Sequence, residues 1–246
     1  MIIKAPKVSV PIKYVEPMLI RVDDLVPHEE LVEGRLRDLI DKIVGEKAVD
    51  IPIIVAPIPG TRKYVILDGH HRWAALRELG CRLAPCIVID YFSDEVKLKT
   101  WYPAIVGSIN TLLRELRSRK LIVTECEYGA RQIGTDILES YAFIVVGSRR
   151  ECYGISGGIR EQRVVSRILS DLNMKGILTL VYYGELEDAI SDLEEKKISY
   201  LFLRRPVTKR DVLEVVRRRE MYAPKTTRHI LPFIPAKTYT PLHRLL

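Results

Sequence analysis

The chain contains no apolar run near the length of roughly 20 residues that a membrane-spanning helix needs. Its first residues, MIIKAPKVSVPIKYVEP, also lack the continuous apolar core and the small-residue cleavage site of a secretory signal peptide. Apolar residues make up 47% and charged residues 29% of the 246 residues, a composition typical of globular proteins with a real core. We therefore expect a cytoplasmic protein that has no membrane partner.

Side-chain amides are scarce, because the only ones are those of Asn110, Gln132, Gln162 and Asn173. Low amide content beside abundant lysine, arginine and glutamate is typical of proteins from hyperthermophiles. This feature indicates a habitat and carries no information on activity.

The four cysteines form no CxxC motif, and no pair of them has convincing zinc-site spacing: Cys81, Cys86, Cys126 and Cys152. The favoured interpretation is that they are small buried apolar side chains. A disulfide stays open as an alternative if the source is a hyperthermophile. We assign none of the four to catalysis.

The formal net charge of +7 fits either a nucleic acid or a phosphate-bearing small molecule as partner. Most basic residues are interleaved with acidic ones, as in LRDLIDKIVGEK and LEDAISDLEEKK, and the clearest basic clusters are SRRE and RRRE. This interleaving favours an ordinary solvated surface. We therefore expect no nucleic-acid partner.

Residues 1–104 predict an α+β domain with a mixed sheet, because short strand patterns and helix patterns alternate. Helices are predicted for residues 30–45 and for RWAALREL, which ends at Gly80. Strands are predicted for MLIRVDDL, IPIIVAPI, KYVILD and APCIVIDYF. The segment 90–104 is predicted to cross to a second domain.

Residues 105–246 predict a second, smaller α/β domain. Strands are predicted for YAFIVVG, ILTLVYYG and YLFLRR, and helices for TLLRELRSRK, IREQRVVSRILSDL, LEDAISDLEEKK and KRDVLEVVRRRE. Thr208 and Asp211 have the spacing of a capping box before the last of these helices. GISGG is interpreted as a turn and helix cap, since the chain has no GxxxxGK[ST] motif. The proline-rich end from residue 221 is expected to lie across another surface and to close an interdomain cleft.

The stretch YVILDGHHRWAAL places polar residues where a strand ends and a helix begins. The first N–H groups of a helix favour an anion, and Gly69 allows the backbone to approach a ligand closely. His70, His71 and Arg72 add donors, so the turn predicts a polyphosphate site. Asp68 would then bind Mg2+ or contact the reacting hydroxyl. The alternative is structural, with Asp68 capping the helix and Arg72 paired to a nearby acid.

Two further motifs hold histidine beside other polar residues. PHEE precedes a predicted helix, so Glu29 and Glu30 are either first-turn acids or site residues. PKTTRH, at 224–229, is dense in donors that suit a carboxylate or a phosphate, and its alternative is a solvated loop. Trp101 either walls a pocket or is simply packed. The three motifs contain four of the five histidines, which favours a site: His28, His70, His71 and His229.

The run from LVPHEEL to CIVIDY resembles the ParB/sulfiredoxin-like domain, with an amphipathic helix, a strand opening with Ile-Pro, a second strand, a Gly-x-x-Arg box, a helix and a strand. In that superfamily the box, here Gly69 to Arg72, binds nucleotide phosphate. Sulfiredoxins carry a catalytic cysteine directly before the box arginine, where this chain has His71. ParB partition proteins continue into a helix-turn-helix domain, and the alternation of strands and helices after residue 105 argues against that.

The motifs PHE, DGHHRWA, DYFSDEVK, TWYPA and PKTTRHILPF resemble the archaeal SerK-type free serine kinases over nearly the whole chain. The resemblance implies phosphorylation of the hydroxyl of free L-serine to O-phospho-L-serine, with ADP or ATP as donor and Mg2+ as cofactor. It implies Glu29 as general base and Asp68 as the second catalytic acid. It also implies a phosphate-binding box and a serine pocket, made respectively of Gly69, His70, His71 and Arg72, and of Trp101, Lys225, Thr226, Thr227 and His229.

Three other functions fit parts of the sequence. A ParB-like regulator or DNA-binding protein would need a helix-turn-helix or a continuous basic face, and neither is seen. A kinase of another small hydroxylated metabolite would share the same motifs. A non-catalytic sensor is disfavoured, because both Glu29 and Asp68 are present. The sequence leaves open ADP or ATP as donor, Glu29 or Glu30 as base, serine or a close hydroxy amino acid as acceptor, and the oligomeric state.

Overall fold

The computed structural model describes residues 1–6, 9–32 and 34–246. The chain forms two compact units. The seven-stranded unit contains Met1–Lys7, Lys99–Val207 and Tyr222–Arg228, and the five-stranded unit contains Val8–Leu98, Thr208–Met221 and His229–Leu246. The compact units are discontinuous in sequence, because two C-terminal segments belong to the same unit as residues 8–98. The division into two domains at residue 104 stays a prediction.

The five-stranded unit is built on a mixed sheet in the order β3-β8-β6-β7-β4, as the sequence predicted. β6 pairs antiparallel with β7 and parallel with β8, while β4 pairs parallel with β7. Four consecutive residues of β6 are completely buried, which explains its continuous apolar run. The strands are β3 (Met18–Arg21), β4 (Leu25–Val26), β6 (Ile53–Pro57), β7 (Tyr64–Asp68) and β8 (Leu83–Val88).

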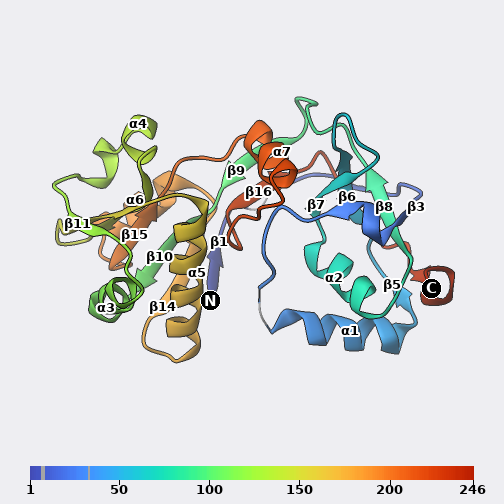
Figure 1. The fold of residues 1–246 in the computed structure, drawn as a ribbon, viewed down its shortest axis with the longest axis horizontal. Coiled ribbons are helices and arrows are strands. Elements are labelled where there is room, and N and C mark those ends of the chain that lie inside the picture. The colour runs from blue at the N-terminus through green and yellow to red at the C-terminus, as the bar shows by residue number, and fades with distance from the viewer. Residues whose placement is uncertain (7–8, 33) are drawn as a thin grey trace. The chain divides into compact units, whose positions relative to one another are not determined.

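Two helices lie on one side of this sheet, α2 (His70–Glu78) against the strands and α1 (Arg35–Glu46) beyond it (Figure 1). α1 begins five residues later than predicted. Gly34, directly before it, has φ 86°, a left-handed conformation that a right-handed helix does not contain. α2 begins at His70, directly after Gly69, so the GHHR turn and the helix are continuous.

The C-terminal residues complete the five-stranded unit, as expected for a segment that lies across another surface. β17 (Ile234–Pro235) pairs with β2 (Ile12–Lys13), and β18 (Thr240–Pro241) pairs with β5 (Ala48–Val49). Leu245 is completely buried in the core of the unit. The helix α7 (Lys209–Arg217) also belongs to this unit, and the predicted capping box of Thr208 and Asp211 is confirmed at its start.

The seven-stranded unit has the strand order β1-β14-β10-β15-β12-β13-β11, antiparallel throughout except for β1 beside β14. The alternation of strands and helices in the sequence therefore does not produce a parallel sheet here. The TWYPA segment supplies β10 within this sheet, and Gly154 to Ser156 of GISGG belong to β13. The strands are β1 (Ile2–Lys4), β10 (Tyr102–Val106), β11 (Val123–Glu125), β12 (Tyr141–Gly147), β13 (Cys152–Ser156), β14 (Thr179–Tyr183) and β15 (Tyr200–Leu203).

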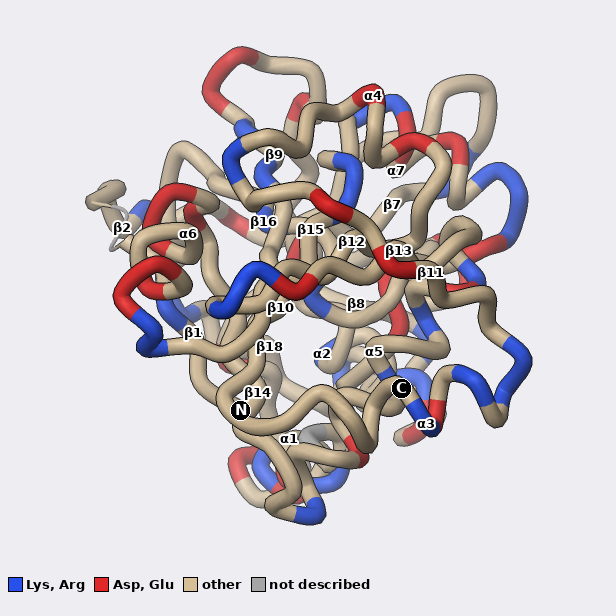
Figure 2. Tube along the Cα trace, turned by 90° about the vertical axis from the view of Figure 1, so that its left-hand side faces the viewer, with Lys and Arg blue, Asp and Glu red and all other residues tan. Residues whose placement is uncertain are grey.

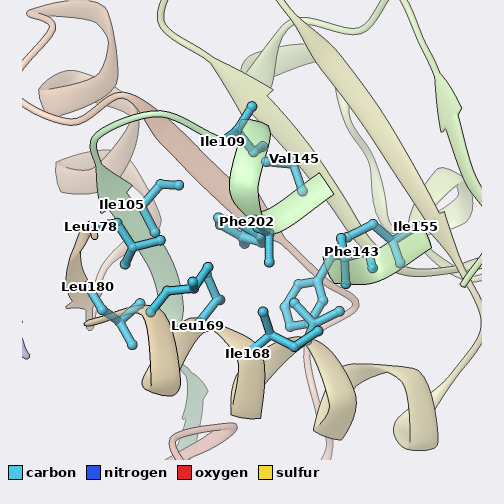
Figure 3. Close-up of a cluster of buried hydrophobic side chains, with 14 of the residues drawn as sticks. Ile105, Ile109, Phe143, Val145, Ile155, Ile168, Leu169, Leu178, Leu180 and Phe202 are labelled. Carbon is cyan, nitrogen blue, oxygen red and sulfur yellow. The ribbon is translucent and has the colours of Figure 1, made fainter. Parts of the chain in front are cut away.

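Helices cover both faces of this sheet. The face that includes Phe143 and Phe202, whose ring centroids are 5.8 Å apart, packs against α3 (Asn110–Ser118) and α5 (Ile159–Met174) (Figure 3). Neighbouring residues such as Ile144 and Leu201 point to the other face, which packs against α4 (Thr135–Leu138) and α6 (Leu186–Glu194). Both faces are therefore apolar, which accounts for uninterrupted runs such as YAFIVVG.

Figure 2 shows short basic and acidic segments interleaved along the trace, as the sequence indicated. In the described residues, no helix is both long enough and apolar enough to cross a membrane. Two short strands, β9 (Lys97–Thr100) and β16 (Thr227–Ile230), lie where the chain passes from one unit to the other.

The cysteines divide into two kinds. Cys81 and Cys86 are buried thiols, as the favoured interpretation predicted, and burial raises the pKa of Cys86 to about 12. Cys126 and Cys152 instead form a disulfide with their Cα atoms 4.9 Å apart. This bond joins the chain just after β11 to the start of β13.

Replacing both disulfide cysteines with serine should lower the free energy of unfolding by about 3 kcal/mol, since the bond closes a loop with a sequence separation of 26. Denaturant unfolding with and without a reducing agent measures the change. The reductant should destabilise the natural protein and leave the Cys126→Ser, Cys152→Ser variant unchanged. Equal unfolding free energies for the two proteins would contradict this role of the bond.

Candidate functional site

The turn between β7 and α2 requires a glycine for two separate reasons. Gly69 has φ 98°, a conformation that costs other residues roughly 1–2 kcal/mol. A Cβ atom at this position would also lie 3.0 Å from Nη2 and 3.1 Å from Cζ of Arg72. The N-cap residue of the helix that follows is Gly69 itself, which has no side chain to bond the first backbone N–H groups, and such groups favour an anion. The sequence-based prediction of an anion-binding turn therefore has the local geometry that it needs.

Arg72 ties this turn to the segment directly before β6. Its Nη1 donates to the carbonyl oxygens of Ile51 and Pro52 at 2.9 and 2.7 Å, and its Nη2 donates to Oδ2 of Asp68 at 2.5 Å. The Arg72 side chain is 14% exposed, whereas that of Asp68 is 58% exposed. The structural alternative is thus present in part, with Asp68 itself as the acid. Arg72 fixes an accessible carboxylate beside the start of α2, and its own contact with phosphate stays a prediction.

Glu29 follows β4 in the sequence, and Asp68 is the last residue of β7, the strand beside it. β4 and β7 are parallel and pair Leu25 with Tyr64 and Val26 with Val65, so their carboxyl ends meet at one edge. Glu29 and Glu30 are partly exposed there, several residues before α1 begins. Neither of them is therefore an ordinary first-turn acid of that helix.

His71 holds the loop that follows the two glutamates. Its Nε2 lies 3.2 Å from both the backbone nitrogen and the carbonyl oxygen of Val32. The second histidine of the GHHR turn therefore connects α2 to the PHEE loop. A role of His71 in binding phosphate stays a prediction.

Three histidines from distant parts of the sequence form one cluster in the five-stranded unit, in which His28 is completely buried and His70 and His229 are half-buried. Nε2 of His70 lies 3.2 Å from Nδ1 of His28, and the ring centroids of His28 and His229 are 5.3 Å apart. The hydroxyl of Tyr91 lies 2.9 Å from Nε2 of His229. Burial lowers the pKa of His28, and burial together with the neighbouring imidazoles holds the pKa values of His70 and His229 well below the ordinary value.

Acidification should destabilise the protein through this cluster. In the unfolded chain these histidines bind protons as the pH falls through about 6.5, whereas in the folded protein they stay neutral to lower pH. The free energy of unfolding therefore has its full value above that pH and decreases progressively below it. Each such histidine contributes a slope of up to about 1.4 kcal/mol per pH unit. Denaturant unfolding at roughly pH 7.5 and 5.5 measures that slope. The slope should become shallower in His229→Gln and stay unchanged in His243→Gln, whose side chain is exposed. Equal slopes in the two variants would contradict the prediction.

The serine-pocket residues predicted in the seven-stranded unit lie together around a buried arginine. Arg204 is 1% exposed and donates to Oγ1 of Thr226 at 2.9 Å and to the carbonyl oxygens of Trp101 and Lys225 at 2.8 and 2.6 Å. Nζ of Lys225 lies 5.2 Å from the centroid of the Trp101 ring, a cation–π distance. Thr226 and Thr227 are themselves buried. The structure thus groups these residues, while their contact with serine stays a prediction.

Arg228 of the PKTTRH motif makes contacts that stabilise the seven-stranded unit. Its Nη1 donates to the carbonyl oxygen of Gly184 at 3.0 Å and pairs with Glu185 at 3.1 Å, and Lys99 pairs with the same carboxylate at 2.7 Å. Arg228 is buried, so PKTTRH is not a solvated loop. His229, the next residue, belongs to the five-stranded unit.

In the described residues, no group of three or more histidine, cysteine, aspartate or glutamate side chains is arranged to hold a metal ion. Mg2+ is commonly bound by one or two carboxylates together with the phosphates of a nucleotide. The exposed carboxylate of Asp68, beside the start of α2, suits that kind of site.

Comparison with known proteins assigns both parts of the chain to known domain families. Residues 4–101 match the ParB N-terminal domain, and residues 100–204 match the C-terminal domain of the L-serine kinase SerK. This combination defines a class of proteins in which a ParB-like domain is joined to a serine-kinase domain. The chain belongs to the L-serine kinase family, and the resemblance seen in its motifs is thereby confirmed.

Three relatives support this assignment over nearly their whole length. The chain is 57% identical to the ATP-dependent L-serine kinase of Staphylothermus marinus, over 99% of this chain and 97% of the relative. It is 59% identical to the ATP-dependent L-serine kinase of Desulfurococcus mucosus, over 99% and 96%. It is 40% identical to the ADP-dependent L-serine kinase SerK of Thermococcus kodakarensis, over 98% of each.

Solved structures show the same fold. A free serine kinase in complex with AMP superposes with a TM-score of 0.92 at 40% identity, over 100% of both chains. A variant with one glutamate replaced by alanine, in complex with ADP, has the same TM-score and identity. The predicted α+β fold with a ParB-like domain is confirmed by these matches.

Proposed function

We propose that this protein transfers a phosphoryl group from ATP to the hydroxyl of free L-serine and releases O-phospho-L-serine. The carrying observation is the β7–α2 turn, where the start of α2, Gly69 and an accessible Asp68 carboxylate lie together in an arrangement that suits an anion with an acid beside it. That geometry supports phosphoryl transfer. The full-length similarity to L-serine kinases narrows the acceptor to serine.

ATP is the donor that the relatives favour. The two relatives that are 57% and 59% identical are ATP-dependent, whereas the ADP-dependent relative is 40% identical. ADP is the alternative donor and differs only in the number of phosphates that the turn must hold. The two donors yield ADP and AMP respectively, so the nucleotide product distinguishes them.

Two carboxylates have separate roles in this proposal. Glu29 accepts the proton of the serine hydroxyl as general base, and Asp68 lies at the phosphate end of the site. Asp68 would hold Mg2+, which when bound neutralises charge on the phosphates. The N–H groups at the start of α2 position the phosphates, and positioning is the larger part of catalysis in phosphoryl transfer.

Serine recognition is assigned to the residues that the family resemblance implies. Lys225 supplies a positive charge for the serine carboxylate, and Trp101 supplies an apolar surface beside it. The remaining members of this set are Thr226, Thr227 and His229. Arg204 holds the backbone carbonyls of Trp101 and Lys225 and is a positioning residue that sequence reasoning missed.

The test incubates the purified protein with Mg2+, L-serine and either ATP or ADP, and detects O-phosphoserine and the nucleotide product by mass spectrometry. We expect phosphoserine and ADP from ATP, with a higher kcat/KM for serine than for threonine or homoserine. Phosphoserine formed only from ADP would reassign the donor. Nucleotide binding without phosphoserine from either donor would overturn the proposed function.

A further inference from the structure

His28 and Tyr91 lie in or against the histidine cluster and have no role in the proposed reaction. His70 and His229 belong to the proposed phosphate and serine sites. His28 and Tyr91 contact them, and His28 is 0% exposed. A fully buried imidazole needs polar partners, so its contacts determine which ring nitrogen carries the proton.

The contacts of His28 determine the protonation of His70. Nδ1 of His28 lies 2.7 Å from the carbonyl oxygen of Ile66. A carbonyl oxygen only accepts, so this nitrogen carries the proton. The same Nδ1 lies 3.2 Å from Nε2 of His70. Two N–H groups cannot face each other at this distance, so Nε2 of His70 presents its lone pair and its proton lies on Nδ1.

Tyr91 acts on His229 in the corresponding way. Its hydroxyl lies 2.9 Å from Nε2 of His229, and a phenol donates readily to a neutral imidazole nitrogen. The proton of His229 is then on Nδ1. Nζ of Lys209 lies 5.7 Å from the centroid of the Tyr91 ring, which adds a positive charge beside the phenol.

We propose that His28 and Tyr91 are positioning residues that hold the ring proton of His70 and of His229 on Nδ1. Each of these two imidazoles then offers an N–H donor in a fixed direction to an anionic ligand. This inference rests on the proposed function for its consequence in catalysis, but the protonation pattern itself does not.

The test reads the protonation directly through long-range 1H–15N correlation spectra of the imidazole rings. The chain has five histidines, and the exposed His243 is an internal reference. We expect the natural protein to show Nδ1–H for His70 and His229. In Tyr91→Phe the His229 signals should move towards a mixture of the two tautomers. In His28→Leu the His70 signals should do so, while His28→Asn, which keeps a donor near the position of Nδ1, should restore them.

Steady-state kinetics give the second readout. The loss of one hydrogen bond should weaken the binding of serine on the order of 5- to 10-fold. The KM for serine should therefore rise by about that factor in Tyr91→Phe, while the affinity for ATP stays unchanged. Tyr64→Phe, which removes a hydroxyl elsewhere in the same unit, is the matched control and should leave both quantities unchanged. Unaltered imidazole spectra in Tyr91→Phe and His28→Leu would overturn the inference. If the natural protein forms no phosphoserine, the proposed function fails while the spectra still decide the protonation pattern.

Discussion

Replacing Glu29 with glutamine should lower kcat for phosphoserine formation by roughly 100- to 10,000-fold, the usual contribution of a general base. Glutamine keeps the size and the hydrogen-bonding shape of the side chain but cannot accept the serine proton. The affinity for nucleotide should change little, because the proposed phosphate site is the start of α2. The rate at saturating ATP and serine measures the effect.

Glu30→Gln is the matched control for this prediction. Both glutamates lie in the same loop at the edge of the sheet and both are partly exposed. Glu30→Gln should therefore retain most of the activity. A large loss in Glu30→Gln with a normal rate in Glu29→Gln would move the base by one residue. Normal rates in both variants would contradict the role of either glutamate as general base.

Replacing Gly69 with alanine should weaken nucleotide binding by at least about tenfold and lower the free energy of unfolding by roughly 1–2 kcal/mol. The stability loss follows from φ 98° at this residue. The loss of affinity has a separate cause. The new Cβ atom would press on the guanidinium of Arg72 at 3.0–3.1 Å and so displace the carboxylate of Asp68. Calorimetric titration with ADP and denaturant unfolding measure the two effects.

Gly80→Ala separates these two causes. Gly80 ends the same helix with φ 73°, but a Cβ atom there meets nothing within 4 Å. It should lose a similar amount of stability and keep the nucleotide affinity of the natural protein. Equal losses of affinity in both alanine variants would show that general strain, and not the contact with Arg72, weakens binding.

The parts of the fold that local patterns determine were predictable. β7 and β12 occupy the stretches that their apolar runs indicate, and the capping box of α7 is present. The sequence did not predict that β1 lies beside β14, or that Leu245 fills the core of the five-stranded unit. Such pairings join residues far apart in the sequence, and no periodicity within one segment encodes them.

The candidate site likewise contains features that the local sequence predicts and contacts that it does not. The glycine, the uncapped helix start and the neighbouring acid of the GHHR turn are consecutive, so the sequence revealed them together. The partners of Arg72 in the Ile51–Pro52 backbone come from a different strand region, and Tyr91 meets His229 across 138 residues. Arg204 lies at the end of the YLFLRR strand, where nothing local distinguishes a buried arginine from a solvated one.

A crystal structure of the Glu29→Gln variant with a non-hydrolysable ATP analogue, Mg2+ and L-serine would show where this protein binds the phosphates and the metal ion. We expect the terminal phosphates within hydrogen-bond distance of the backbone N–H groups of His70, His71 and Arg72, with the metal ion at the carboxylate of Asp68. Phosphates bound away from the start of α2, with Asp68 contacting neither metal nor phosphate, would contradict this expectation.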